Sequence, residues 1–114
     1  MSGQRSTIKV LIVDDQRTFG EALQLALAKE QDMQVVDVVT DGTSAVRAVS
    51  RLRPDVVLMD VAMPGMSGID ATRRIKEADP DAHILILSGY EDELLLGRAV
   101  QAGALGLVRK TEAV

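Results

Sequence analysis

An α/β domain built on a parallel sheet is the fold class that the sequence predicts. Five short apolar segments, most of them rich in β-branched residues, alternate along the chain with segments whose apolar residues recur at helical spacing. Several of the short segments are nearly continuous in apolar character, as expected of strands covered on both faces. This alternation favours parallel strands joined by right-handed crossovers, with helices on both faces of the sheet. The 114 residues suffice for one such domain.

The five predicted strands differ in how apolar they are. The first is followed directly by Asp14-Asp15, and the third leads into Asp60 and then a Pro-Gly loop. The second contains Gln34 and Asp37 and is therefore predicted at an edge of the sheet. The predicted strands span residues 8–13, 33–39, 55–59, 82–88 and 104–108.

Three predicted helices carry one apolar stripe each. The first is expected to begin with a capping box formed by Thr18 and Glu21. The second follows a turn at Asp41-Gly42 and is stopped by Pro54, and the third runs from about residue 67 to residue 78. The residues expected to face the sheet are Phe19, Ala22, Leu23, Ala26, Leu27, Ala45, Ala48, Val49, Leu52, Ile69, Thr72 and Ile75.

Composition excludes several classes of function. The chain has no cysteine, which rules out disulfides and thiol chemistry. Its net charge of −4 makes it a poor nucleic-acid binder by itself. No apolar run approaches the roughly 18 residues that a membrane span needs, and residues 1–7 lack the apolar region of a signal peptide. We therefore expect a cytoplasmic protein.

Polar residues stand at the predicted ends of four strands: Asp14-Asp15, Asp60, Ser88 and Lys110. The carboxyl ends of parallel strands share one edge of the sheet, so these side chains are expected to converge. Two carboxylates about 4 Å apart repel by on the order of 4 kcal/mol at an effective dielectric of 20, which a divalent cation would relieve. Oxygen ligands without Cys or clustered His favour Mg²⁺. A lysine and a hydroxyl beside such a site suit phosphoryl transfer.

The chain resembles the receiver domain of two-component response regulators. The matching segments are residues 10–15, 41–42, 55–68, 86–89 and 102–110, which together cover essentially the whole chain. The last segment is similar to the subfamily that carries a LuxR-type helix-turn-helix after the receiver. The resemblance implies a flavodoxin-like fold with strand order 2-1-3-4-5. It also implies phosphorylation by a sensor histidine kinase and output through a DNA-binding domain that is absent here.

The resemblance also implies roles for individual residues. Asp60 would be the phosphoacceptor and, with Asp15, would bind Mg²⁺ directly. Asp14 would act on the metal through water, and the backbone carbonyl of Ala62 would be a further ligand. The hydroxyl of Ser88 would bind the phosphoryl group, and Lys110 would pair with it.

Two departures from the family pattern stand out. Leu107 occupies the position three residues before Lys110, where the family usually has an aromatic switch residue. The sequence also ends about four residues after Lys110, before a fifth helix. We therefore expect the fifth helix to be missing or truncated and residues 1–114 to be the receiver part of a longer protein. Apolar surface on the first helix and fifth strand would then be exposed and promote self-association.

The fourth predicted helix carries more leucine than one sheet-facing stripe requires. It opens with Glu91-Asp92-Glu93, continues with Leu94-Leu95-Leu96, and ends at Gly103 as a C-cap. In the family this region often carries dimer contacts, so we expect a homodimer through residues 91–108. The alternative is that Leu94 or Leu96 is simply a single exposed leucine.

Two other functions remain as alternatives. An aspartyl-phosphate phosphatase or similar Mg²⁺ hydrolase would also use a carboxylate nucleophile, but it would normally carry a second acid at position 62, where this chain has Ala62. A receiver that never takes phosphate is favoured by Leu107 and opposed by the complete set of acidic, hydroxyl and lysine residues.

Overall fold

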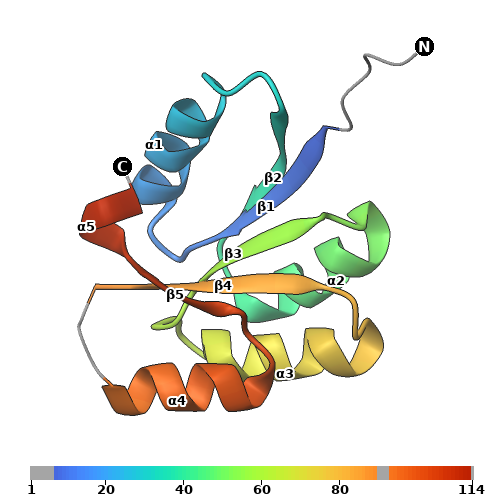
Figure 1. Cartoon of the computed structure of the whole chain (residues 1–114), viewed down its shortest axis with the longest axis vertical. Helices are drawn as coiled ribbons and strands as arrows, with labels where there is room; N and C mark the ends of the chain where they lie inside the picture. Colours follow the sequence, from blue (N-terminus) through green and yellow to red (C-terminus); the bar gives the residue numbers. More distant parts are fainter. Residues whose placement is uncertain (1–6, 90–92, 114) are drawn as a thin grey trace.

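The computed structural model describes residues 7–89 and 93–113. Five parallel strands form one sheet with the order β2-β1-β3-β4-β5, so the predicted α/β class, strand order and edge position of β2 are confirmed (Figure 1). The strands are β1 (Ile8–Val13), β2 (Met33–Val39), β3 (Val56–Asp60), β4 (His83–Ser88) and β5 (Gly106–Arg109).

Helices cover the two faces of the sheet unequally. Three helices, α2, α3 and α4, pack side by side on one face, and α1 lies on the other (Figure 1). The fifth element, α5, is a single turn in the described part of the chain, which confirms the prediction of a missing or truncated fifth helix. The helices are α1 (Arg17–Leu27), α2 (Gly42–Leu52), α3 (Gly68–Ala78), α4 (Glu93–Ala102) and α5 (Lys110–Ala113).

The interior strand β1 contributes to two core clusters because successive side chains of a strand point to opposite faces. Leu11 and Val13 are fully buried in the cluster shared with α2, α3 and α4. Val10 and Ile12 belong to the cluster on the α1 side. Both faces of β1 are therefore apolar, which explains its nearly continuous apolar sequence.

The predicted capping box at the start of α1 is wrong. The helix begins at Arg17, so Thr18 already lies inside its first turn, and the side chain of the N-cap residue Gln16 makes no capping hydrogen bond. The carboxylate of Asp14 instead accepts a hydrogen bond of 2.8 Å from the backbone N–H of Gln16. This hydrogen bond links the loop that follows β1 to the start of α1.

The start and end of α2 depend on two residues with special conformations. Asp41, predicted in a turn, is the N-cap, and its carboxylate accepts a 2.7 Å hydrogen bond from the N–H of Ser44. This bond is the first cause of a lowered pKa of the Asp41 carboxyl. Arg53 ends the helix in the left-handed region at φ +51°, immediately before Pro54, as expected because the residue before proline disfavours the helical region.

Helix α3 begins against the backbone of β3. Ser67 caps it by accepting a 3.1 Å hydrogen bond from the N–H of Asp70. Thr72 and Ile75 are buried as predicted, but Ile69 is only half-buried and Ala71 takes its place against the sheet.

The end of α4 explains why β5 begins later than predicted. The N–H groups of Gly103 and Ala104 bond to the carbonyls of Val100 and Ala99, each at 3.0 Å, which is the Schellman pattern of a helix end. Gly103 adopts φ +111°, so its predicted C-cap role is confirmed. Ala104 therefore belongs to the helix stop and not to the strand. The predicted opening residues Glu91 and Asp92 lie outside the described residues.

Other strand boundaries shift by one residue, with β3 and β4 starting at Val56 and His83. The apolar stripe of α1 has a buried Leu23, while Phe19, Ala22, Ala26 and Leu27 are half-buried. In the part of the chain that the structure describes, no helix combines the length and apolar character of a membrane span.

Candidate functional site

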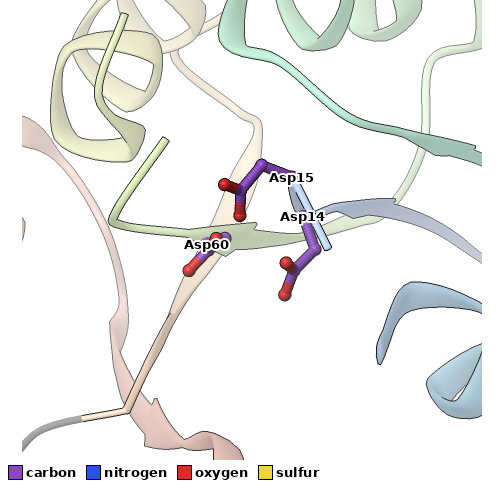
Figure 2. Close-up of side chains that lie close together, drawn as sticks. All are labelled: Asp14, Asp15 and Asp60. Atoms are coloured by element: carbon purple, nitrogen blue, oxygen red, sulfur yellow. The ribbon is translucent and has the colours of Figure 1, made fainter. Parts of the chain in front are cut away.

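Three strand ends bring the predicted site residues together. Asp14 and Asp15 follow β1, Asp60 is the last residue of β3, and Lys110 follows β5 as the first residue of α5. Strands β1 and β3 are parallel neighbours, and Val13 lies beside Met59. The residues that follow Val13 and Met59 therefore lie at the same edge of the sheet. Figure 2 shows the carboxylates of Asp14, Asp15 and Asp60 gathered there.

The three carboxylates form a compact acidic cluster. Asp14, Asp15 and Asp60 each offer one oxygen, and these oxygens all lie within 4.8 Å of one another (Figure 2). Asp14 and Asp60 are buried, whereas Asp15 is exposed to solvent. Burial weakens the solvent screening of their charges, so the repulsion is stronger here than on an open surface.

Lys110 neutralises part of this charge. Its Nζ lies 2.8 Å from Oδ2 of Asp14 and 3.3 Å from Oδ1 of Asp60. Its side chain is only 17 % exposed. The same Nζ lies 4.8 Å from the centroid of the Phe19 ring in the first turn of α1.

The two oxygens of Asp14 have different environments. Oδ1 accepts the hydrogen bond from Gln16, as described above. Oδ2 is buried and has Lys110 as an ion-pair partner, but no donor among the described residues meets the geometry of a hydrogen bond to it. A buried carboxylate oxygen with spare acceptor capacity is suited to a cation or to a water molecule bound to one.

Burial and neighbouring charges shift the pKa values of two site residues. Desolvation by burial, followed by the charge of Asp14, raises the pKa of Asp60 from 3.8 to about 6, against the opposing effect of Lys110. Burial by itself would lower the pKa of Lys110, but its close ion pair with Asp14 and the charge of Asp60 raise the pKa overall. At neutral pH the site therefore combines an ionised Asp60 with a protonated lysine.

An open cleft of about 450 Å³ leads to the acidic cluster. Asp15, Asp60, Ala62, Gly89 and Lys110 are among the residues that line it. The predicted backbone ligand at position 62 thus lies on the same cleft as the carboxylates.

Ser88 is fully buried at the end of β4. Leu87 is the register partner of Asp60, so Ser88 lies one residue beyond it at the same edge of the sheet, directly before the cleft-lining Gly89.

The donor set fits a hard divalent cation. Carboxylate oxygens from Asp14, Asp15 and Asp60 lie within 4.8 Å of one another, beside a cleft that is open to solvent for bound water. Mg²⁺ is characteristically held by one or two carboxylates together with water and phosphate oxygens. His83, the only histidine of the sequence, is exposed at the start of β4, away from this edge.

Two residues at the site had no functional role in the sequence interpretation. Phe19 was assigned only to the apolar stripe of α1, yet its ring faces Lys110. Gly68 was assigned only to the start of the third predicted helix, yet a Cβ atom there would lie 2.0 Å from the carbonyl oxygen of Asp60. The glycine is thus required by the close approach of α3 to the end of β3, which sequence spacing alone does not reveal.

Leu107, at the position of the usual aromatic switch, is half-buried and packs against the cluster on the α2–α4 face. The next residue, Val108, packs on the α1 face. The side chain at position 107 thus points toward the layer that contains α4.

The fold and the acidic cluster together define a flavodoxin-like α/β domain with a cation-suited site at the carboxyl edge of its sheet. The family model described as response regulator receiver domain matches residues 10–114. The chain therefore belongs to the response regulator receiver family, and the predicted family is confirmed.

Relatives of known type agree with this family. The transcriptional regulatory protein DegU of Brevibacillus brevis is 38 % identical over 103 residues, which cover 90 % of this chain and 44 % of that protein. Protein-glutamate methylesterase/protein-glutamine glutaminase 4 of Geobacter metallireducens is 46 % identical over 101 residues, covering 86 % and 29 % respectively. The chain thus spans less than half the length of either relative.

A solved structure shares the whole fold. The crystal structure of a LuxR-family two-component response regulator from Aurantimonas sp. SI85-9A1 superposes with a TM-score of 0.89 at 34 % identity. The match covers 93 % of this chain and 76 % of that one.

Proposed function

We propose that this receiver domain accepts a phosphoryl group on Asp60 from a sensor histidine kinase, in a Mg²⁺-dependent reaction. The observation that carries the proposal is the convergence of Asp14, Asp15 and Asp60 within 4.8 Å, with Lys110 bound to two of them. The family membership of the chain supports the same reaction. In this role the domain is a phosphoacceptor and not an enzyme acting on a separate substrate.

Asp60 is the nucleophile in this proposal. Its carboxylate oxygen forms a bond to phosphorus while the phosphorus–nitrogen bond of the phosphohistidine breaks, and the imidazole nitrogen leaves with the electron pair and takes up a proton. Asp60 must be ionised to attack, and its pKa of about 6 leaves it mostly ionised at neutral pH. Burial limits the hydration of the carboxylate, which keeps it reactive.

Lys110 and Ser88 receive the transferred group. Phosphorylation adds about 1.5 to 2 negative charges to the site. Lys110, already 3.3 Å from Asp60, pairs with this charge. Ser88 donates its hydroxyl to a phosphoryl oxygen, which requires the chain around Gly89 to move because Ser88 is fully buried.

Four groups would hold the metal: the carboxylates of Asp15 and Asp60, the carboxylate of Asp14 through water, and the backbone carbonyl of Ala62. The bound ion supplies positive charge that offsets the repulsion among the carboxylates and the incoming phosphoryl oxygens.

The output of the domain is a change in a protein–protein surface. We propose that movement of the loops after β3 and β4 alters the surface of α4 and β5, which forms a homodimer through residues 91–108. The similarity to DegU and to the LuxR-family structure supports a LuxR-type transcription regulator, acting in the cytoplasm and reaching DNA through a further domain.

Incubation with acetyl phosphate and Mg²⁺, followed by intact mass spectrometry, tests the reaction. We expect one phosphoryl adduct that is stable in acid and labile in base, as an acyl phosphate should be. The adduct should disappear in Asp60→Asn and in samples treated with a chelator.

Asp81→Asn is the matched control, because Asp81 is an exposed aspartate in the turn that precedes β4. It should be phosphorylated like the unchanged chain. An adduct that persists in Asp60→Asn, or no adduct with acetyl phosphate or any histidine kinase, contradicts the proposal.

A further inference from the structure

The environment of Lys110 includes one contact that the proposed reaction does not use. Its ammonium group lies between the carboxylates of Asp14 and Asp60 on one hand and the ring of Phe19 on the other. A cation 4.8 Å from a ring centroid is within the range where the negative face of the ring attracts it. The attraction is stronger when the pair is shielded from water, and the Lys110 side chain is 17 % exposed.

Phe19 is itself held in place by packing. It is half-buried and packs against the cluster of Val10, Ile12, Leu23 and Leu87. The adjacent Gly20 brings α1 close to β2, because a Cβ there would come within 2.8 Å of a Val38 methyl group. The ring therefore has packing contacts with the sheet in addition to its contact with the lysine.

A lysine side chain has a flexible four-carbon stem and loses substantial conformational freedom when it is held in one place. Ion pairs to Asp14 and Asp60 fix the ammonium group on one side only. If Asp60 becomes an acyl phosphate, its present ion pair with Lys110 is lost. The ring of Phe19 is unaffected by that change. A neutral, rigid surface can thus keep the ammonium group at the site in both states.

We infer that Phe19 is a positioning residue that holds the Lys110 ammonium group, through its ring face, where it can bind the phosphoryl group on Asp60. This inference rests on the proposed phosphorylation of Asp60. Phe19 acts only through Lys110 and has no contact of its own with the transferred group. The family usually has an aromatic residue three positions before this lysine, and this chain has Leu107 there. The aromatic ring beside Lys110 comes from α1 instead.

The sequence offers a clean test, because Phe19 is the only phenylalanine in the 114 residues. Biosynthetic replacement of phenylalanine by its mono-, di- and trifluorinated analogues changes this ring alone. Each added fluorine withdraws electron density from the ring face with little change in shape. We expect the affinity for beryllofluoride, used as the phosphoryl analogue with Mg²⁺, to fall stepwise along the series, by about three- to tenfold in total.

Variants separate the ring from its bulk. Phe19→Leu removes the ring and keeps an apolar side chain, so it should lower the beryllofluoride affinity about three- to tenfold, and Phe19→Tyr should restore it. Leu27→Ala, two turns further along the same stripe, is the packing control. It should lower the melting temperature without changing the affinity of the folded protein.

The ¹⁹F resonance of the fluorinated ring reports the contact without any ligand. We expect it to shift in Lys110→Met, and we expect the fluorine dependence of beryllofluoride binding to vanish in that variant. A resonance unchanged by Lys110→Met, or an affinity that is indifferent to fluorination, overturns the role of Phe19 alone. Failure of the unmodified protein to bind beryllofluoride overturns the proposed function as well, so the two failures are distinguishable.

Discussion

Asp60 is in a position that favours its neutral form, because it is buried beside a second carboxylate. Its pKa in the folded chain is about 6, above the ordinary value of 3.8. Between these two pH values the folded state binds a proton that the unfolded state does not. The stabilisation from this proton is present at low pH and is lost as the pH rises through about 6. The proposed phosphoacceptor is thus accommodated at a cost to stability, as is common for functional sites.

Replacing Asp60 by Asn should therefore stabilise the folded chain at pH 7. In metal-free buffer we expect an increase of about 1 to 3 kcal/mol in the free energy of unfolding, because the buried charge is removed. Thermal or urea unfolding between pH 4 and pH 8 would measure it. The gain should shrink toward pH 4, and an equal gain at both ends of this range would contradict the assigned pKa.

Helix α3 reaches the site only because Gly68 has no side chain. A Cβ at this position would lie 2.0 Å from the carbonyl oxygen of Asp60, which is backbone and cannot rotate away. The N–H of Gly68 also donates a 3.0 Å hydrogen bond to the carbonyl of Val61. The contact thus fixes the start of α3 relative to the end of β3.

Gly68→Ala should destabilise the chain by about 1 to 3 kcal/mol, because the loop must shift to admit a methyl group. Gly97→Ala is the matched control, since Gly97 lies in α4 with nothing within 4 Å of an added Cβ. It should instead stabilise the chain by roughly 0.5 to 1 kcal/mol. Urea unfolding of both variants measures the contrast, and equal effects in the two glycines would show that the close approach is unimportant.

Several large apolar side chains are exposed on α4 and in the segment that follows it, beside the exposed Arg98 and Gln101. Leu94, Leu96 and Val100 are exposed, and Leu105 in the segment before β5 is 65 % exposed. A group of exposed apolar side chains of this kind is typical of a protein–protein contact. Leu25 on α1 is equally exposed but lies on the opposite face of the sheet.

Leu96→Glu should reduce self-association, because it would place a charge one turn from the exposed Val100 on the same side of α4. Light scattering with and without beryllofluoride measures the mass in both states. Leu25→Glu is the control and should leave the association unchanged. Unaltered association of Leu96→Glu in both states would refute a dimer through residues 91–108.

Over the whole molecule, a cation at the acidic cluster should stabilise the fold. The carboxylates of Asp14, Asp15 and Asp60 converge only when β1 and β3 are paired, so the ion binds the folded chain and not the unfolded one. A ligand of this kind shifts the unfolding equilibrium by mass action.

Mg²⁺ should therefore raise the melting temperature, and a chelator should reverse the increase. At a Mg²⁺ concentration one hundred times its dissociation constant, we expect the free energy of unfolding to rise by about 2.7 kcal/mol. Asp15→Asn should lose most of this effect because it removes one ligand, whereas Asp81→Asn should retain it. A response to Mg²⁺ that is the same in both variants would place the ion elsewhere.

The sequence by itself determined the α/β class, the parallel sheet and the identity of the acidic and basic residues, because apolar periodicity and strand-end position are local properties. The order of the strands and the roles of individual residues came from the family resemblance. Only the tertiary structure decided which groups touch. The contact of Phe19 with Lys110 and the need for Gly68 beside Asp60 depend on distances between elements far apart in the chain. The failed capping box at Thr18 has the same cause, since the carboxylate of Asp14 and the packing of α1 on the sheet moved the helix start to Arg17.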